Sequence, residues 1–415
     1  MPESEILFRD STAFSGKRMH LSVTGSVACY RACDLLRLFI KMGIHVSVSV
    51  SAGAAQFVTP MLFEALGAVP VYSEMPAREQ GCFAHLEPGQ LAMAMMIAPA
   101  SANMLSKLAC GAASDLVSAQ ALAFDGPLLL APAMNPRMWA HPAVQANVHT
   151  LAQRGCEIIT PGSGGTACGD TGQGRLAEVP QLFWAALKAL APQDMAGKKV
   201  LITLGPTREY WDAVRFWSNP SSGRMGFCLA LSAWLRGAEV HAVCGPTAFE
   251  VPHAIKRYSV MSAEEMYAQC DALWDTMDYG LFSAAVADFA PNRSQHIREQ
   301  KCKKKDVPEE FPILFHKNRD ILMTLAARRR SQQKILAFAA ETSPNAESLL
   351  ALAHEKCGRK GADVLAANQV NEADSGFVSP MNRMAVVDAK GREELWPTMS
   401  KADVAWRLCS WLLKT

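Results

Sequence analysis

Short apolar runs alternate with helical patterns along the first half of the chain. Runs rich in β-branched residues end in turns of small residues, and stretches such as Cys33–Met42 then repeat apolar positions at the period of a helix. The runs lie at Leu21–Val23, Val46–Val50, Met95–Ile97, Leu128–Leu130 and Ile158–Ile159. Strands that alternate with helices are typical of a parallel sheet covered on both faces.

The same alternation restarts after a short polar break. Its runs predict strands at Val200–Leu204, Glu239–Val243, Leu281–Val286, Ile335–Ala339 and Val364–Ala367. Residues 383–397 are typical of a late β-hairpin, and residues 400–413 of a final amphipathic helix. The pattern therefore predicts an α/β chain of two domains.

The expected boundaries follow from these breaks in the pattern. Residues 1–18 are polar and mixed in charge, which predicts a loose leader. A flavodoxin- or Rossmann-like domain with a parallel sheet is expected at residues 19–190, and a linker at 191–198. A Rossmann-like domain with a late hairpin is expected at residues 199–415.

Composition narrows the class of protein without naming it. Half of the 415 residues are hydrophobic and 19% are charged, as in ordinary globular proteins, and the formal net charge of +2 gives no nucleic-acid or membrane signal. No run approaches the 18 apolar residues of a membrane span. The twelve cysteines include no Cys-x-x-Cys pair, which argues against a zinc ribbon, and scattered thiols predict the reducing cytoplasm.

One stretch in the second half is typical of a phosphate site. Residues 205–209 read Gly-Pro-Thr-Arg-Glu and residues 218–226 read Ser-Asn-Pro-Ser-Ser-Gly-Arg-Met-Gly, between an apolar run and a helical pattern near Phe227. Backbone N–H groups and the positive dipole end of a helix suit a phosphate there. A phosphate site near mid-chain predicts a second functional module.

Several longer strings carry a resemblance to known families. Residues 98–103 read Ala-Pro-Ala-Ser-Ala-Asn, residues 132–139 read Pro-Ala-Met-Asn-Pro-Arg-Met-Trp, and residues 167–176 read Ala-Cys-Gly-Asp-Thr-Gly-Gln-Gly-Arg-Leu. Together they resemble the flavin-dependent cysteine decarboxylases. The stretch described above, with Ala-Ala-Val-Ala-Asp at 284–288, resembles phosphopantothenate–cysteine ligases. Both sets in this order resemble the bifunctional family of coenzyme A biosynthesis.

The resemblance implies two reactions on small molecules. Cysteine is joined to 4′-phosphopantothenate with CTP through an acyl-cytidylate, and the product is decarboxylated to 4′-phosphopantetheine with FMN as electron sink. It also implies Mg²⁺ and a homo-oligomer built from decarboxylase trimers, grouped in a dodecamer, and ligase dimers. No nucleic-acid or membrane partner is implied, and ATP in place of CTP stays open.

The resemblance assigns three catalytic residues to the decarboxylase half. These are His85, Asn135, which would bind the substrate carboxylate, and Cys168, which would protonate the enethiol. Their ordinary alternatives are a structural histidine, a turn asparagine and a buried thiol. The expected FMN contacts are Gly25, Ser26, Ser51, Pro99, Ala100 and Ser101, and Met134 and Arg175 are expected to contact substrate or flavin.

In the ligase half the resemblance assigns the acyl-cytidylate to Asn219 and a phosphate or carboxylate to Arg215. The expected nucleotide contacts are Ser221, Ser222, Gly223, Ala284, Asp288, Lys301, Asn318, Arg319, Asp320, Ile321, Phe338, Lys356 and Lys360. Asp288 would contact cytosine or ribose, with a metal ion as its alternative. Lys301 begins a basic run that is otherwise typical of a solvated loop.

Two other hypotheses fit parts of the sequence. One is a flavoprotein of the same fold that decarboxylates a peptide cysteine or prenylates flavin, with a degenerate second domain; intact ligase motifs argue against it. The other is a non-catalytic flavin-binding regulator that sequesters a phosphatase. Retention of His85, Asn135 and Cys168, and the absence of an acidic tail, argue against the regulator.

Overall fold

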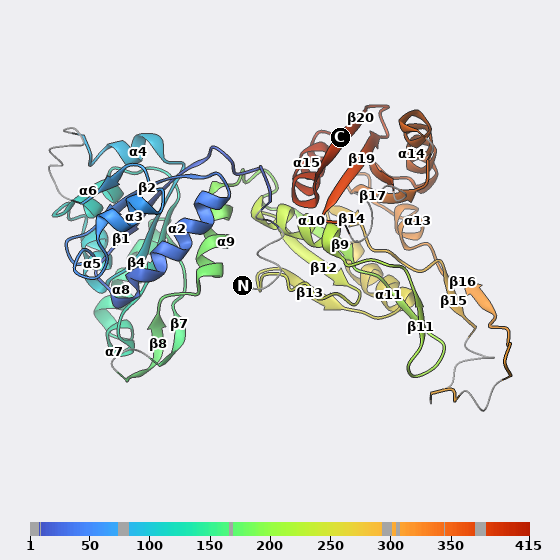
Figure 1. Cartoon of the computed structure of the whole chain (residues 1–415), viewed down its shortest axis with the longest axis horizontal. Coiled ribbons are helices and arrows are strands. Elements are labelled where there is room, and N and C mark those ends of the chain that lie inside the picture. Colours follow the sequence, from blue (N-terminus) through green and yellow to red (C-terminus); the bar gives the residue numbers. More distant parts are fainter. Residues whose placement is uncertain are drawn as a thin grey trace. The chain divides into compact units, whose positions relative to one another are not determined.

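The chain folds into two α/β units. The computed structural model describes residues 8, 10–73, 83–165, 169–292, 301–303, 308–343, 345–369 and 379–415. One unit, here the N-terminal unit, is Thr12–Ala191. The other, the C-terminal unit, is Pro192–Thr415 together with Met1–Ser11 (Figure 1).

The N-terminal unit is built on six parallel strands in the order β3-β2-β1-β4-β5-β6. The strands are β1 Arg18–Val23, β2 His45–Val50, β3 Val71–Tyr72, β4 Ala94–Ala100, β5 Leu128–Pro132 and β6 Glu157–Ile158. The expected strands are confirmed, and β3 was missed because two residues carry no periodic signal. The order reverses between β1 and β4, which is where doubly wound sheets bind their ligands.

Helices cover this sheet, and a small ribbon follows it. The helices are η1 Val27–Tyr30, α2 Arg31–Lys41, α3 Pro60–Ala65, α4 Glu87–Leu91, α5 Ala102–Cys110, α6 Leu116–Leu122, α7 Pro136–Trp139, α8 Pro142–Gln153 and α9 Val179–Leu190. Helices α2 and α9 lie side by side (Figure 1). Between them, Phe39 stacks on Phe183 with 6.0 Å between the ring centroids. The antiparallel ribbon is β7 Gly162–Gly165 with β8 Thr171–Arg175.

The C-terminal unit repeats the same strand order and then extends it. Its sheet runs β13-β12-β9-β14-β17-β18-β19-β20, and the last two strands are antiparallel. The strands are β9 Lys199–Leu204, β12 Glu239–Cys244, β13 Lys256–Ser259, β14 Tyr279–Phe282, β17 Lys334–Glu341, β18 Val364–Gln369, β19 Met381–Asp388 and β20 Glu393–Ser400. The expected late hairpin, β19 and β20, is confirmed.

Helices and two short ribbons complete this unit. The helices are α10 Arg224–Leu235, α11 Ala263–Trp274, α13 Ile321–Ala326, α14 Ala346–Lys360 and α15 Lys401–Leu413. The ribbons pair β10 Arg208–Tyr210 with β11 Phe216–Ser218, and β15 Phe289–Pro291 with β16 Phe315–Lys317. Strand β14 ends at Phe282, four residues before the expected end, and Ala285 then pairs with Pro206 in an isolated parallel bridge.

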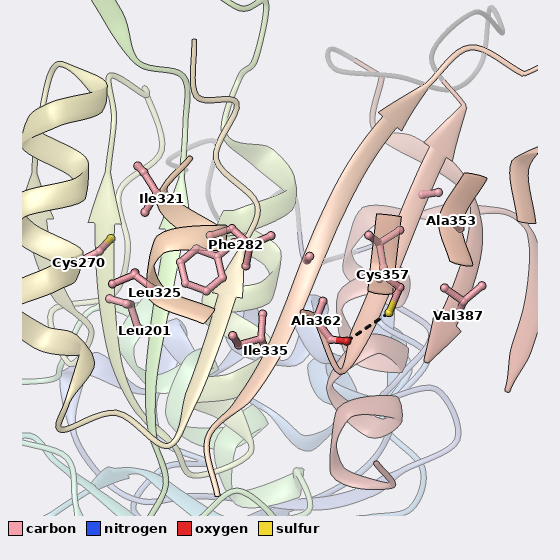
Figure 2. Packing of buried hydrophobic residues seen from close by; sticks show 14 of the residues in the cluster. Leu201, Cys270, Phe282, Ile321, Leu325, Ile335, Ala353, Cys357, Ala362 and Val387 are labelled. Carbon is pink, nitrogen blue, oxygen red and sulfur yellow. Dashed lines mark hydrogen bonds between the residues drawn. The ribbon is translucent and has the colours of Figure 1, made fainter. Parts of the chain in front are cut away.

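The core of this unit joins its strands to the helices that cover them. Figure 2 shows Phe282 and Ile335 from neighbouring strands among Leu201 and Leu325, and Cys357 Sγ directed at the carbonyl oxygen of Ala362, at 3.2 Å. Each such side chain contributes roughly 1.5–3 kcal/mol when fully buried. The strand ends are therefore held rigidly enough to position a site.

The segment expected as a loose leader contains two buried aromatic side chains in the part that is described. Phe8 is buried in the C-terminal unit, with its ring 6.4 Å from that of Trp406. Phe14 is buried in the N-terminal unit, and β1 already begins at Arg18. Apolar burial therefore orders this described part, which its polar composition concealed.

Candidate active sites

A cavity of about 990 Å³ lies beyond the carboxyl ends of the strands in the N-terminal unit, and we call it the first cavity. Its walls are the loops after β1, β2, β4 and β5 together with β8. The expected residues that line it are Gly25, Ser26, Ser51, Ser101, Met134, Asn135 and Arg175. Pro99 and Ala100 do not line it, since Ala100 is fully buried within β4.

Thr24 joins the two loops at the point where the strand order reverses. Its hydroxyl donates to the carbonyl oxygen of Pro99 at 2.7 Å and accepts from the Ser101 N–H at 2.9 Å. Ser101 caps α5 by accepting from the Met104 N–H. Pro99 thus acts on the site by holding Thr24, and a helix N-terminus faces the cavity, as phosphate binding requires.

Asn135 lies at the start of α7 and is oriented by an acidic neighbour. Its Nδ2 donates to Asp170 Oδ2 at 2.7 Å, and Arg137 donates to Asp170 Oδ1 at 3.0 Å. These contacts, first that from Asn135, lower the pKa of Asp170 from its ordinary value. The carboxylate therefore stays ionised and keeps accepting from the amide.

The β7–β8 ribbon approaches Asn135 closely. The Met134 N–H donates to the Gly174 carbonyl oxygen at 2.9 Å. Gly174 has φ +148°, and a Cβ there would lie 2.6 Å from the Met134 carbonyl oxygen. Only glycine permits this approach, which brings Arg175 to the cavity.

Of the other two expected decarboxylase residues, one lies apart from this lining and the other falls outside the described residues. His85 is half-buried in the turn before α4 and is not among the residues that line the first cavity. Its segment is held where Gln120 donates to the Ala84 carbonyl oxygen at 2.9 Å and Tyr72 donates to Glu87 at 2.7 Å. Cys168 lies outside the described residues, between β7 and β8.

A second cavity, of about 420 Å³, lies at the corresponding strand ends of the C-terminal unit. The expected residues that line it are Asn219, Ser221, Gly223, Ala284, Asp288, Asn318, Arg319, Asp320, Ile321, Phe338, Lys356 and Lys360. The tertiary structure thus gathers residues spread over about 140 positions of the sequence. Helix α10 begins at this cavity, with Gly223 as its left-handed N-cap at φ +81°.

Two asparagines position the backbone that carries Asp288. Asn219 Nδ2 donates to the Val286 carbonyl oxygen at 2.9 Å, and Asn318 Nδ2 donates to that of Ala287 at 2.8 Å. The Asn318 N–H also donates to the Asp288 carbonyl oxygen at 2.8 Å. Both side-chain amides therefore bind the backbone between β14 and β15. Each keeps a second amide proton and a carbonyl oxygen for other partners.

Two lysines of the second cavity pair with carboxylates, and an anionic ligand would compete with these carboxylates for the lysine charges. Lys356 pairs with Glu341, and Lys360 lies 3.5 Å from Asp320. The Arg319 guanidinium lies over the Tyr267 ring, 4.1 Å from its centroid, and this cation–π contact holds the side chain in place.

Three expected residues do not line the second cavity: Arg215, Ser222 and Lys301. Arg215 donates to Asp212 at 2.6 Å and to the Cys302 carbonyl oxygen at 3.2 Å. Burial alone would raise the pKa of Asp212, but the N–H groups of Arg215, Val214 and Cys302 and the Arg215 guanidinium lower it to about 2. The Cys302 N–H also donates to Asp212, so the ion pair fixes the backbone next to exposed Lys301. Ser222 lines an adjacent pocket instead.

Sequence reasoning missed two buried polar residues of the second cavity. Asn382 is 3% exposed and Lys401 is 4% exposed, and both line it. Burial, with the nearby charge of Arg224, lowers the pKa of Lys401 to about 8. Both follow Gly223 by more than 150 positions, so no local motif links them to it.

The described part of the chain contains neither a cluster of metal-ligating side chains nor a helix of membrane-spanning character. There, no group of three or more His, Cys, Asp or Glu side chains is arranged to hold a metal ion. Nor does any helix among the described residues have the length and apolar character needed to cross a membrane.

Each unit has a sheet whose parallel strands carry a cavity at their carboxyl ends, which defines a two-domain α/β protein. Residues 8–190 match the family model described as Flavoprotein, and residues 195–415 match that of the DNA/pantothenate metabolism flavoprotein C-terminal domain. The chain belongs to the family of coenzyme A biosynthesis bifunctional proteins, as its relatives show.

Three relatives carry the name coenzyme A biosynthesis bifunctional protein CoaBC. That of Vibrio vulnificus (strain CMCP6) is 37% identical over 390 residues, covering 94% of this chain and 95% of its own. That of Escherichia coli (strain K12) is 37% identical, covering 90% and 91%. That of Bacillus subtilis (strain 168) is 34% identical, covering 95% and 96%. The chain is thus a bifunctional enzyme of coenzyme A biosynthesis, with a flavoprotein decarboxylase region and a ligase region.

Proposed function

We propose that the C-terminal unit joins cysteine to 4′-phosphopantothenate with CTP, and that the N-terminal unit decarboxylates the product with FMN. The observation that supports this most is the second cavity. It gathers a glycine-capped helix start, two lysines and an aromatic ring, which suit the phosphates and base of a nucleotide. The name shared by the relatives supports both activities.

The first cavity fits FMN in size and in chemistry. Its volume of about 990 Å³ lies at the upper end of the range for small-molecule and cofactor pockets, and Ser26, Ser51 and Ser101 place hydroxyls where a phosphate and a ribityl chain would bind. When bound, FMN supplies the electron sink for the decarboxylation. Asn135, fixed by Asp170, would hold the substrate carboxylate without neutralising it, since the leaving CO₂ is neutral.

In the ligase site the protein mainly positions reactants and offsets charge. Asn219 would hold the acyl-cytidylate, Lys356 and Lys360 would bind phosphate oxygens, and Phe338 would stack on cytosine. Mg²⁺ is proposed to accompany the CTP phosphates, with Asp288 as the candidate protein ligand. CTP is preferred here over ATP on the family resemblance.

Three further features are proposed on the same resemblance. These are decarboxylase trimers grouped in a dodecamer, ligase dimers, and a cytoplasmic location. Free thiols among the described residues, such as buried Cys228 and exposed Cys110, support a reducing compartment.

One coupled assay tests the proposed function. The full-length chain, incubated with 4′-phosphopantothenate, cysteine, Mg²⁺ and either CTP or ATP, is expected to release pyrophosphate with CTP only when both other substrates are present. With FMN bound, CO₂ release should follow. Absence of the CTP-dependent pyrophosphate would refute the ligase proposal, and equal rates with ATP would refute the preference for CTP.

A further inference from the structure

A chain of buried hydrogen bonds in the N-terminal unit reaches the residue before His85. It starts on strand β2, where Ser49 Oγ donates to Gln120 Oε1 at 2.6 Å. Gln120, on helix α6, donates in turn from Nε2 to the Ala84 carbonyl oxygen at 2.9 Å. Ser49 and Gln120 are fully buried, and the proposed function gives neither side chain a part.

A second buried hydrogen bond holds the chain on the other side of His85. The Tyr72 hydroxyl, on strand β3, donates to Glu87 Oε2 at 2.7 Å, and Tyr72 is 1% exposed. Ala84 packs with Tyr72 and Leu116 in one apolar cluster. A buried side chain therefore holds the backbone before His85 and another holds the side chain two positions after it. We call Gln120 and Tyr72 the two anchors of His85.

The anchor at Tyr72 is backed by a buried, uncharged ring. His20 on strand β1 is fully buried, its Nδ1 lies 2.8 Å from Ser47 Oγ in a hydrogen bond, and its ring centroid lies 6.1 Å from that of Tyr72. Burial lowers the pKa of His20 to about 3, so the ring stays neutral at physiological pH. A hydrogen-bonded neighbour thus supports Tyr72 on the side of the sheet.

The half-buried His85 side chain depends on these anchors for its position. Among the described residues none forms a hydrogen bond with its imidazole. Its place is therefore set by the chain at Ala84 and Glu87, the two residues that the anchors hold. Buried polar networks whose members are paired make a site rigid.

The Gln120 anchor also relates His85 to the first cavity. Ser49 lies two residues before Ser51, which lines that cavity and is an expected FMN contact. Gln120 thus bridges the strand that leads into the cavity and the segment that carries His85. Groups that act in one reaction need fixed separations, because a displacement of about 1 Å can cost roughly a hundredfold in rate.

We propose that Gln120 and Tyr72 are positioning residues for the decarboxylation: they fix residues 84–87 and so hold the His85 imidazole in its working place relative to the first cavity. This inference rests on the proposed decarboxylation and on the catalytic role that the family resemblance implies for His85. Neither anchor lines the first cavity, so both act through His85.

One variant tests each anchor. Gln120→Met keeps the length of the side chain and removes both of its hydrogen bonds. Tyr72→Phe removes a single hydroxyl, so it tests the proposal even where Gln120→Met does not fold. Tyr258→Phe is the matched control, because it removes a hydroxyl that bonds to His241 in the C-terminal unit. CO₂ release from supplied 4′-phosphopantothenoylcysteine is measured with full-length, FMN-loaded chains, and flavin absorbance measures FMN retention.

Gln120→Met is expected to lower kcat by about tenfold and Tyr72→Phe by about threefold, with KM and FMN retention within about twofold of the parent chain. Tyr258→Phe should match the parent chain. In a His85→Asn background, either anchor change should alter the remaining rate by less than about twofold, because no imidazole is left to position.

A parent-like kcat in every anchor variant that folds would overturn the proposal. So would a loss of rate that follows a loss of FMN, or an equal fold-loss with and without His85, since both are marks of a merely structural role. A His85→Asn chain that works at the parent rate would overturn it as well. In these cases CO₂ release by the parent chain leaves the proposed decarboxylation standing. Only its absence from the FMN-loaded parent chain would refute that function, and this inference with it.

Discussion

Two asparagine side chains, Asn135 and Asn219, each donate an amide proton to the protein within a proposed site. Asn135 binds a carboxylate, whereas Asn219 binds the Val286 carbonyl oxygen. An amide suits both places because it donates and accepts at once without carrying charge. In the proposed function, the same residue type would thus orient a substrate group in two different electrostatic settings.

Asn219→Asp is expected to slow ligation by about 10²–10³-fold, because a carboxylate would face both the Val286 carbonyl oxygen and the acyl-phosphate charge. Pyrophosphate release and cysteine-dependent amide formation measure the loss. Decarboxylation of supplied 4′-phosphopantothenoylcysteine by the same variant is the internal control and should be unchanged. Ligation at the parent rate would remove the role assigned to Asn219.

Asp170→Ala is expected to lower decarboxylation about tenfold, because Asn135 loses the acceptor that orients its amide. Ligation by the same chain should be unaffected. Since the pKa of Asp170 is lowered, the ionised form persists at and above the ordinary carboxyl range, and its support of Asn135 fades only as the pH falls through the lowered pKa. A neutral-pH decarboxylation rate equal to that of the parent chain would contradict this role.

At the scale of elements, both units use one strand order around their cavities. The orders β3-β2-β1-β4-β5-β6 and β13-β12-β9-β14-β17-β18 correspond strand by strand, and each cavity lies where the order reverses. Periodicity in the sequence predicted the long strands of both sheets. It missed β3, β13 and the short ribbons, because strands of two to five residues without a buried alternating face carry too little signal.

Two glycine-to-alanine changes within helices should have opposite effects. A Cβ at Gly226 in α10 would collide with Leu204 and Ser283, so Gly226→Ala is expected to destabilise the C-terminal unit by about 1–3 kcal/mol. At Gly358 in α14 nothing lies within 4 Å, so Gly358→Ala should stabilise it by about 0.5–1 kcal/mol. Thermal unfolding of the full chain measures both. Equal changes in the unfolding temperature of both variants would show that the contacts around Gly226 do not set the effect of its replacement.

The turn between β10 and β11 is stabilised by ionised Asp212. Its folded pKa of about 2 lies below the ordinary value, so its stabilising contribution is complete above about pH 4 and is lost as the pH falls toward 2. Asp212→Asn is therefore expected to lower stability by about 1–3 kcal/mol at neutral pH. The difference from the parent chain should shrink between pH 4 and pH 2, as urea unfolding at several pH values would show; a constant difference would argue against this ionisation.

At the scale of the whole molecule, the two activities belong to separate units of one chain. Each described unit has its own sheet and its own cavity, so a defect in one should leave the other working.

A mixture of Asn219→Asp and Cys168→Ser chains is therefore expected to convert 4′-phosphopantothenate to 4′-phosphopantetheine, at a rate limited by release of the intermediate. Cys168→Ser alone should accumulate the oxidised enethiol, and the double variant in one chain should form no final product. Product formation is followed by mass spectrometry. Failure of the mixture, with each parent activity intact in its own variant, would show that the units do not work independently.

Local sequence was enough to establish the α/β class, the repeated strand theme and most residues at the strand ends, because strand periodicity and glycine-rich turns are local properties of a chain. The tertiary structure alone decided which of these residues share a cavity. It excluded Pro99, Ala100, Arg215, Ser222 and Lys301 from the linings where they were expected, and it brought Asn382 and Lys401 into one. Such groupings depend on contacts between segments far apart in sequence, and no local pattern of residue types encodes them.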